Sequence, residues 1–345
     1  MLNDILSQEQ LDRLKQLIAE SESIVLCCHQ NPDGDALGSC LAWAEVLKTV
    51  FGKTVELFVP DLYPDYLQWM PNTEKIIRYD KHREGCDFTL AHADLIFCLD
   101  FNTASRTADM EAALVASPAK KVLIDHHLDP AVDTVLTISH PEASSTCELV
   151  FRLVWQLGCF DQLTKHFAVP LYCGMMTDTG AFTYNSNRAA VYDCVSRLME
   201  RGVDKDMLYR KIFWTMTPQR LRLQGYLLYT KMQLIPGTHA AYMTLTNKER
   251  RLLGTKNGDT EGIVNLPLQI SGMKLTCLMS QDTEHPEQYR ISLRSVDDFP
   301  CNRLSADFFD GGGHKNAAGG RFTGSEEEAI EQFKKAVKAY EQLLR

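Results

Sequence analysis

The sequence of 345 residues contains no long uncharged apolar run, no low-complexity tract and no evident repeat. A membrane-spanning helix needs about 18 or more consecutive apolar residues, so no membrane span is expected. The first ten residues, MLNDILSQEQ, are acidic and place no basic stretch before an apolar one. They therefore do not resemble a secretory signal peptide.

Paired cysteine motifs are also missing. None of the eleven cysteines forms a C-x-x-C motif, and cysteine within an apolar run behaves as a small hydrophobic residue. Five of them lie in such runs: Cys27, Cys28, Cys98, Cys173 and Cys277. The pattern argues against a disulfide framework or a zinc finger. It favours a reducing, cytoplasmic environment.

Positive charge is scarce, because 36 Lys and Arg residues face 45 Asp and Glu residues and the net charge is −9. Proteins that follow long nucleic acids usually carry a basic stripe, and the sequence shows none. Long duplex nucleic acid is therefore not the expected partner. A small anionic substrate is compatible if a few cations gather locally, and carboxylates that hold metal would account for part of the acidity.

Short apolar, β-branched runs alternate with helical stretches in the first half. The runs cover residues 24–28, 55–59, 95–99, 122–124 and 135–138, and helical stretches cover residues 36–50 and 106–115. Near-continuous apolar strands indicate a parallel sheet covered on both faces. In such sheets ligands gather at the carboxyl ends of the strands. The predicted fold class is α/β.

The second half begins with a mostly helical segment. Ser145-Thr-Cys-Glu148 resembles a capping box that opens a helix, with Gly158 as its stop. After Pro236-Gly237 the character shifts to strands at 241–245, 274–280 and 289–294, followed by an amphipathic helix at 326–344. We therefore expect a first domain over 1–190, a helical connector over 191–234 and a smaller α/β domain over 235–345.

Side chains able to bind metal follow the first predicted strand. His29 is followed by Asp33 and Asp35 on a tight turn between strand and helix, where Pro32 and Gly34 favour the turn. Taken alone, this segment is explained equally well as turn chemistry.

Three further segments end in the same kind of residue. Asp100 ends an apolar strand, which is a common arrangement, but the strand at 122–124 ends in Asp125-His126-His127, which packing alone does not explain. Asp178 ends an apolar run that is expected to be a helix, where its charge opposes the helix dipole, so a positive group should lie beside it.

Together these ends supply two imidazoles and four carboxylates from His29, Asp33, Asp35, Asp100, His126 and Asp178. Ligands rich in oxygen and free of thiolate suit Mn²⁺ or Mg²⁺, and the histidines favour Mn²⁺. Two ions about 3.5–4 Å apart suit the hydrolysis of a phosphate ester. The sequence therefore predicts a two-metal phosphoesterase.

The same residues resemble the motifs of the DHH phosphoesterase superfamily in order and type. Asp310-Gly-Gly-Gly-His314 and Ser292-Leu-Arg294-Ser resemble the DHH-associated C-terminal domain, so the resemblance spans essentially the whole chain. It implies one metal on His29, Asp33 and Asp100. It implies a second metal on Asp35, Asp100, His126 and Asp178, with Asp100 as the bridge.

The resemblance also implies roles for the neighbouring residues. Asp125 would orient ligands or fix a histidine tautomer, and His127 would face the substrate phosphate as a proton donor. Glycines before His314 allow close backbone approach to an anion. The candidate substrate-binding residues are Arg294, Gly311, Gly312, Gly313, His314 and Arg106, with Arg290 and Lys315 as weaker ones.

Within the superfamily, the chain is most similar to the group of nanoRNases and oligoribonucleases, which implies short oligoribonucleotides or adenosine 3′,5′-bisphosphate as substrate. A cleft between the two domains would then limit substrate length, and the chain would be a monomer or homodimer. The alternatives are a phosphodiesterase for linear dinucleotides, a polyphosphate or pyrophosphate phosphatase, and a nucleotide sensor without turnover.

Overall fold

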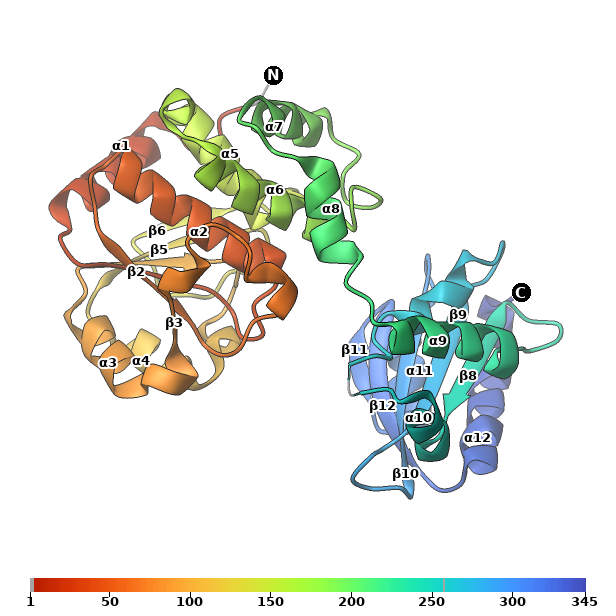
Figure 1. The fold of residues 1–345 in the computed structure, drawn as a ribbon. Helices are drawn as coiled ribbons and strands as arrows, with labels where there is room; N and C mark the ends of the chain where they lie inside the picture. Colours follow the sequence, from red (N-terminus) through yellow and green to blue (C-terminus); the bar gives the residue numbers. More distant parts are fainter. Residues whose placement is uncertain (1–2, 257) are drawn as a thin grey trace. The chain divides into compact units, whose positions relative to one another are not determined.

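The computed structural model describes residues 3–256 and 258–345, and the chain divides into two compact units, Met1–Thr215 and Met216–Arg345. Each unit has its own sheet (Figure 1) and its own hydrophobic core. Of the helices within 191–234, α8 (Lys205–Phe213) belongs to the N-terminal unit and α9 (Pro218–Tyr226) to the C-terminal unit.

The N-terminal unit contains a six-stranded sheet in the order β3-β2-β1-β4-β5-β6, with every pair of neighbours parallel. The strands are β1 (Ile24–Cys27), β2 (Val55–Val59), β3 (Ile76–Arg78), β4 (Leu95–Leu99), β5 (Lys120–Asp125) and β6 (Leu136–Ser139). The predicted parallel α/β fold is confirmed, and β3 is an edge strand that the sequence pattern did not indicate.

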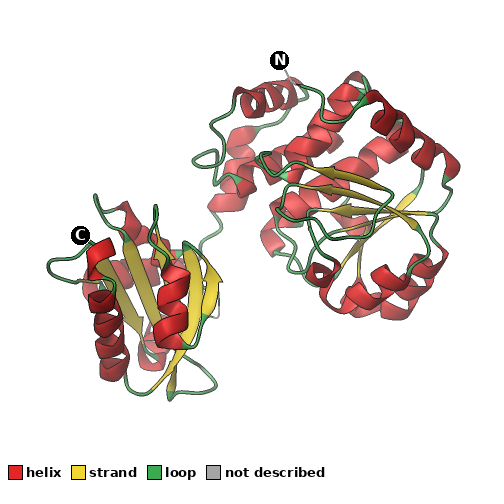
Figure 2. Cartoon of the chain, turned by 180° about the vertical axis from the view of Figure 1, so that it is seen from behind, coloured by secondary structure: helices red, strands yellow, loops and turns green. Residues whose placement is uncertain are grey.

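Helices cover both faces of this sheet (Figure 2). They are α1 (Gln8–Glu20), α2 (Gly34–Thr49), α3 (Tyr79–His92), α4 (Glu111–Ala116), α5 (Thr146–Gln156), α6 (Lys165–Asp178) and α7 (Ala189–Glu200), besides α8. Alternate strand residues point to opposite faces. Leu26 and Phe97 pack with α1, α2, α5 and α6, while Val25 and Ile96 pack with α3 and α4.

The C-terminal unit is built on a second sheet in the order β11-β12-β10-β9-β8-β7, in which only β8 and β9 pair in parallel. Its strands are β7 (Gln233–Leu234), β8 (Ala240–Leu245), β9 (Leu275–Gln281), β10 (Gln288–Ser295), β11 (Gly312–His314) and β12 (Ala317–Thr323). Its helices, besides α9, are α10 (Asn247–Leu253), α11 (Cys301–Phe309) and α12 (Glu326–Ala339). The predicted smaller α/β body is confirmed.

The faces of this second sheet also pack on separate groups of helices. One face packs on α11 and α12, and the other on α9 and the short helix Ile263–Gln269. Among the described residues of both units, no helix combines the length and apolar character needed to cross a bilayer.

Candidate metal centre

The loop after β1 supplies the first imidazole. His29 is buried, with 6% of its surface exposed. Its Nδ1 lies 2.7 Å from the carbonyl oxygen of Gln30. This contact is satisfied when Nδ1 carries the proton, which leaves the Nε2 lone pair free for a ligand.

The two carboxylates on the next turn point in different directions. Asp33 caps α2, because its Oδ1 accepts hydrogen bonds from the amides of Asp35 (2.9 Å) and Ala36 (3.0 Å). Asp35 is almost fully buried and accepts hydrogen bonds from the amides of Thr146 (2.7 Å) and Cys147 (2.9 Å). These amides open α5, where the positive end of the helix dipole favours a carboxylate.

Asp100 follows β4 in the left-handed backbone region, with φ of 65°. Few residues other than glycine adopt this conformation, and such strain concentrates at functional sites. The carboxylate is buried, and its Oδ1 accepts a hydrogen bond from the Thr146 hydroxyl at 2.9 Å.

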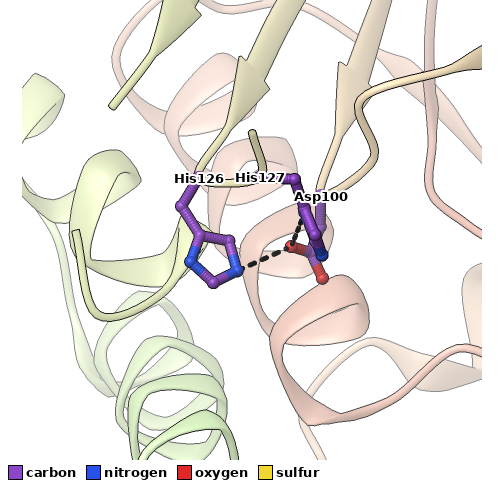
Figure 3. Close-up of side chains that lie close together, drawn as sticks. All are labelled: Asp100, His126 and His127. Atoms are coloured by element: carbon purple, nitrogen blue, oxygen red, sulfur yellow. Dashed lines mark ion pairs between the residues drawn. The ribbon is translucent and has the colours of Figure 1, made fainter. Parts of the chain in front are cut away.

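His126 and His127 follow β5, and both lie beside Asp100 (Figure 3). The Nε2 of His126 is 3.6 Å from Asp100 Oδ1 and 3.4 Å from Asp178 Oδ2. Its Nδ1 faces the carbonyl of Ala143 at 3.4 Å. The ring therefore directs Nε2 towards the carboxylates, and it lies beside Asp178 at the end of α6.

The six side chains form two groups that share Asp100. In the first, His29 Nε2 lies 3.4 Å from Asp100 Oδ2 and 3.9 Å from Asp33 Oδ1. In the second, His126 Nε2 lies near Asp100 Oδ1, Asp178 and Asp35, whose Oδ2 is 3.9 Å away. Three sets of residues could each hold a metal ion, because the donor atoms within a set all lie within 4.8 Å of one another. The sets are His29 with Asp33 and Asp100, Asp35 with His126 and Asp178, and Asp100 with His126 and His127.

This donor set fits divalent cations. Burial raises the pKa of Asp35 and Asp178, and it raises the pKa of Asp100 to about 6 although His29 opposes the rise. Burial alone would lower the pKa of His29, but Asp100 raises it to about 10. The carboxylates of Asp35, Asp100 and Asp178 thus carry a desolvation cost that bound cations would offset. Carboxylate and imidazole donors suit Mn²⁺ or Mg²⁺.

A chain of polar contacts holds His127. Its Nδ1 lies 2.7 Å from Asp125 Oδ1, and its Nε2 lies 2.8 Å from Arg106 Nη1. Because the guanidinium can only donate, Nε2 accepts and Nδ1 donates to Asp125. Asp125 is fully buried and its Oδ2 has no partner among the described residues. The arrangement fixes both the tautomer and the orientation of His127.

Thr146, which no sequence motif singled out, contacts both Asp35 and Asp100. The predicted capping box, Ser145 to Glu148, includes Thr146, and only one of its two hydrogen bonds is present. Ser145 does cap α5 through the Glu148 amide. The Glu148 carboxylate instead accepts hydrogen bonds from the Ser144 amide (2.7 Å) and from Arg188 (2.7 Å). The start of α5 is therefore held in place while Thr146 faces the carboxylates.

Glycine at the crossing of α2 and α6 allows the carboxylates to meet. A Cβ on Gly174 would overlap the Cys147 sulfur and lie 2.9 Å from Asp35 Oδ1. A Cβ on Gly38 of α2 would overlap the carbonyl oxygen of Pro170. The missing side chains let the helices approach closely. As a result Asp178, the last residue of α6, lies beside His126.

The remaining candidates lie in the C-terminal unit. The glycine-rich segment before His314 contains strand β11, in which Gly312 pairs with Gly319 and His314 with Ala317. Gly313 has φ of 137°, and Gly311 has no room for a Cβ beside the Gly319 carbonyl. These two glycines are therefore needed for the backbone path.

Arg294 lies opposite Ala317 in the same sheet. Its Nη1 donates to the Leu293 carbonyl at 2.9 Å, and it forms no ion pair with any described carboxylate. His314 is exposed, and Lys315 pairs with Asp298 at 2.6 Å.

Carboxylates and imidazoles thus gather at the carboxyl edge of a parallel sheet, where α/β proteins bind ligands, in groups that could hold metal ions. Residues 23–175 match the DHH family, N-terminal domain, and residues 240–343 match the DHHA1 domain. The chain belongs to the DHH family, and it is a hydrolase that acts on phosphoester bonds.

Similar proteins span nearly the whole chain. The crystal structure of an exopolyphosphatase-related protein from Bacteroides fragilis is 44% identical, covers 99% of each chain and has a TM-score of 0.91. A probable bifunctional oligoribonuclease and PAP phosphatase from Streptococcus mutans is 27% identical over 86% of this chain and 89% of its own length. A bifunctional oligoribonuclease and PAP phosphatase from Thermus thermophilus is 26% identical over 91% of this chain and 89% of its own length.

Proposed function

We propose that this protein uses two divalent metal ions to hydrolyse phosphate esters in short nucleotides. Its substrates would be very short oligoribonucleotides, adenosine 3′,5′-bisphosphate, or both. The observation that carries the proposal is the position of Asp100, whose Oδ2 lies 3.4 Å from His29 and whose Oδ1 lies 3.6 Å from His126. One carboxylate thus faces two separate groups of donors, as a bridge between two ions requires.

The sequence motifs and the distances support the same division of ligands. One ion would be held by His29, Asp33 and Asp100, and the other by Asp35, Asp100, His126 and Asp178. Bound ions of this kind activate water and stabilise negative charge on phosphoryl oxygens. Oxygen ligands with two imidazoles favour Mn²⁺ over Mg²⁺.

Arg106, His127 and Asp125 would act on the substrate side. Arg106 now donates to His127 Nε2, and a substrate phosphate would attract this guanidinium, because arginine binds phosphate oxygens well. His127 Nε2 would then be free to carry a proton to the leaving oxygen. Asp125, which accepts from Nδ1, would stabilise the protonated ring as a positioning residue.

The names of the two curated relatives support the choice of substrate, since both match most of this chain and are described as acting on oligoribonucleotides and PAP. In the C-terminal unit, Arg294 and the segment Gly311–His314 would bind a terminal phosphate. An acidic chain also agrees better with short substrates than with long ones.

A substrate panel tests the proposal. Purified protein with Mn²⁺ is given di- to pentaribonucleotides, adenosine 3′,5′-bisphosphate, linear dinucleotides and pyrophosphate, and the released mononucleotide or phosphate is measured. We expect turnover of the short RNAs or of the bisphosphate. Protein that binds Mn²⁺ but hydrolyses neither would contradict the proposal.

Inorganic polyphosphate is a second candidate substrate, because the Bacteroides fragilis relative is described as exopolyphosphatase-related. Including a polyphosphate chain in the same panel separates the two candidates. A preference for polyphosphate over every nucleotide would favour this second function.

A further inference from the structure

A cavity of about 480 Å³ lies in the C-terminal unit, between α10 and the connection from β9 to β10. Its lining contains four cationic side chains and no carboxylate. The lining residues are Asn247, Lys248, Arg250, Arg251, Gly254, Thr255, Lys256, Gln281, Thr283 and Pro286. Such a concentration of one charge is unexpected in a chain with a net charge of −9.

The protein balances only part of the positive charge in this cavity. Lys248, Arg251 and Lys256 form no ion pair with the described carboxylates. Arg250 is partly buried, and its Nε has no hydrogen-bond partner among those residues. Burial lowers the pKa of Arg250 and the neighbouring Arg290 lowers it further, while Asp282 and Asp259 offset only part of this effect. A desolvated arginine beside another cation costs free energy that a bound anion would recover.

The strand register separates this cavity from the segment Gly311–His314. At the cavity end of the sheet, Gln281 pairs with Tyr289 and Ser280 pairs with Arg290. At the other end, Arg294 pairs with Ala317, which also pairs with His314 of β11. Arg290 and Arg294 are four residues apart on β10, about 13 Å along the strand.

We infer that the cavity beside α10 is a second anion-binding site that holds the linked phosphate groups of a nucleoside polyphosphate or of an oligonucleotide backbone. Two arginines and two lysines around one cavity provide the charge-assisted hydrogen bonds that such groups accept. The volume is within the range of small-molecule sites and accommodates a nucleotide. The inference is independent of the metal centre, since every lining residue belongs to the C-terminal unit.

The test measures equilibrium binding to the full chain, treated with EDTA so that no substrate is consumed. The probes are inorganic tripolyphosphate and a triribonucleotide, each titrated calorimetrically into protein that carries Arg294→Met, which removes the arginine near Gly311–His314. Adding Arg250→Met and Arg251→Met should weaken binding about 10-fold or more for each charged hydrogen bond lost. Lys335→Met on α12 removes one charge from a helix outside the cavity and should leave both affinities unchanged.

The two probes distinguish the sources of phosphate. Equal losses for both probes assign the cavity to phosphate groups alone, and a loss only for the triribonucleotide assigns it to an RNA backbone. Unchanged affinity for both probes overturns the inference, whatever the protein hydrolyses when Mn²⁺ is present. Arg250→Met should melt at the same or a higher temperature, because it removes a desolvated charge. If it melts lower, the exposed pair Lys248→Met and Arg251→Met provides the same test without the partly buried position.

Discussion

Among the six clustered side chains, Asp100 has a distinct position because its two carboxylate oxygens face different histidines. The Thr146 hydroxyl fixes one of these oxygens, and the left-handed backbone at Asp100 directs the carboxylate between them. Asp33, by contrast, is half-exposed and already accepts two amide hydrogen bonds at the start of α2. Metal binding should therefore depend more on Asp100 than on Asp33.

At the scale of this residue, we expect Asp100→Asn to lower kcat by more than the 10- to 100-fold typical of a lost outer-shell partner. The variant retains the shape of the side chain but loses the charge shared by both groups of ligands. Mn²⁺ stoichiometry, measured by calorimetry, should fall together with hydrolysis. The exposed Asp133→Asn removes the same charge from the connection between β5 and β6 and should change neither quantity. Full activity in Asp100→Asn would exclude a bridging role.

At the scale of elements, the close crossing of α2 and α6 positions the second group of ligands. Gly34 faces Thr177 and Gly174 faces Asp35, both without room for a Cβ. Because α6 carries Asp178 at its end, a small displacement of this helix moves one carboxylate away from His126.

We therefore expect Gly174→Ala to cost about 1–3 kcal/mol of unfolding free energy, as overpacking does, and to reduce hydrolysis. Gly225→Ala is the matched control, since it makes the same substitution in α9 with nothing within 4 Å of the new Cβ. That control should be neutral or stabilise by up to about 1 kcal/mol. Urea unfolding and turnover by both variants are the measurements. A Gly174→Ala protein as stable and active as wild type would show that the crossing tolerates a wider spacing.

Glu249 connects α9 and α10 in the C-terminal unit. Burial alone would raise its pKa, but hydrogen bonds from Tyr226, the Thr246 amide and Lys231 hold the pKa at about 2. A carboxyl whose pKa is lowered on folding stabilises the protein above its ordinary value of 4.5, and this contribution is lost as pH falls towards 2.

Glu249→Gln should thus cost about 1.5–3 kcal/mol at pH 6, the range for hydrogen bonds to a charged group. The difference from wild type should shrink as pH falls below about 4.5. Chemical unfolding at pH 6 and at pH 3.5 measures this change. The exposed Glu284→Gln should show no difference at either pH, and a difference for Glu249→Gln that is independent of pH would contradict the assignment.

At the scale of the whole molecule, the two units have separate cores, and all six candidate ligands belong to the N-terminal one. A metal that binds only the folded state stabilises it, by about 2.7 kcal/mol at 100 times the dissociation constant. Calorimetry with increasing Mn²⁺ should therefore raise the melting temperature of one transition and leave the other in place. EDTA should reverse the shift and abolish hydrolysis, and Asp100→Asn should reduce the shift. Equal shifts of both transitions would contradict this assignment.

The parts of this molecule that were predictable from sequence are those governed by local pattern. The predicted strands 55–59 and 95–99 agree in their bounds with β2 and β4, and residues 95–99 are apolar and fully buried. Asp100 and His126 were predicted as metal ligands because they follow apolar strands. Strand β11 was not predicted, because Gly312 and Gly313 carry no side-chain pattern. The metal and substrate roles assigned to the site residues stay predictions.

Long-range contacts could not be predicted from the sequence, for a different reason. Thr146 contacts Asp35 through its amide, across 111 positions of sequence, and any residue except proline has such an amide. The proximity of Arg250 to Arg290 was equally hidden, because the two residues belong to separate elements, α10 and β10.

The spread of the ligands along the chain has a consequence for biosynthesis. His29 and Asp178, the first and last of the six positions, are 149 residues apart. Contacts between residues so far apart in the sequence form slowly in folding. A ribosome-bound chain that ends before α6 would contain all six strands of the first sheet but only five of the six donors. Because the N-terminal domain folds as a unit during synthesis, Mn²⁺ should protect a stalled nascent chain from protease only after α6 has left the exit tunnel. Metal acquisition would then mark the addition of α6 to the N-terminal unit while the DHHA1 domain is still being translated.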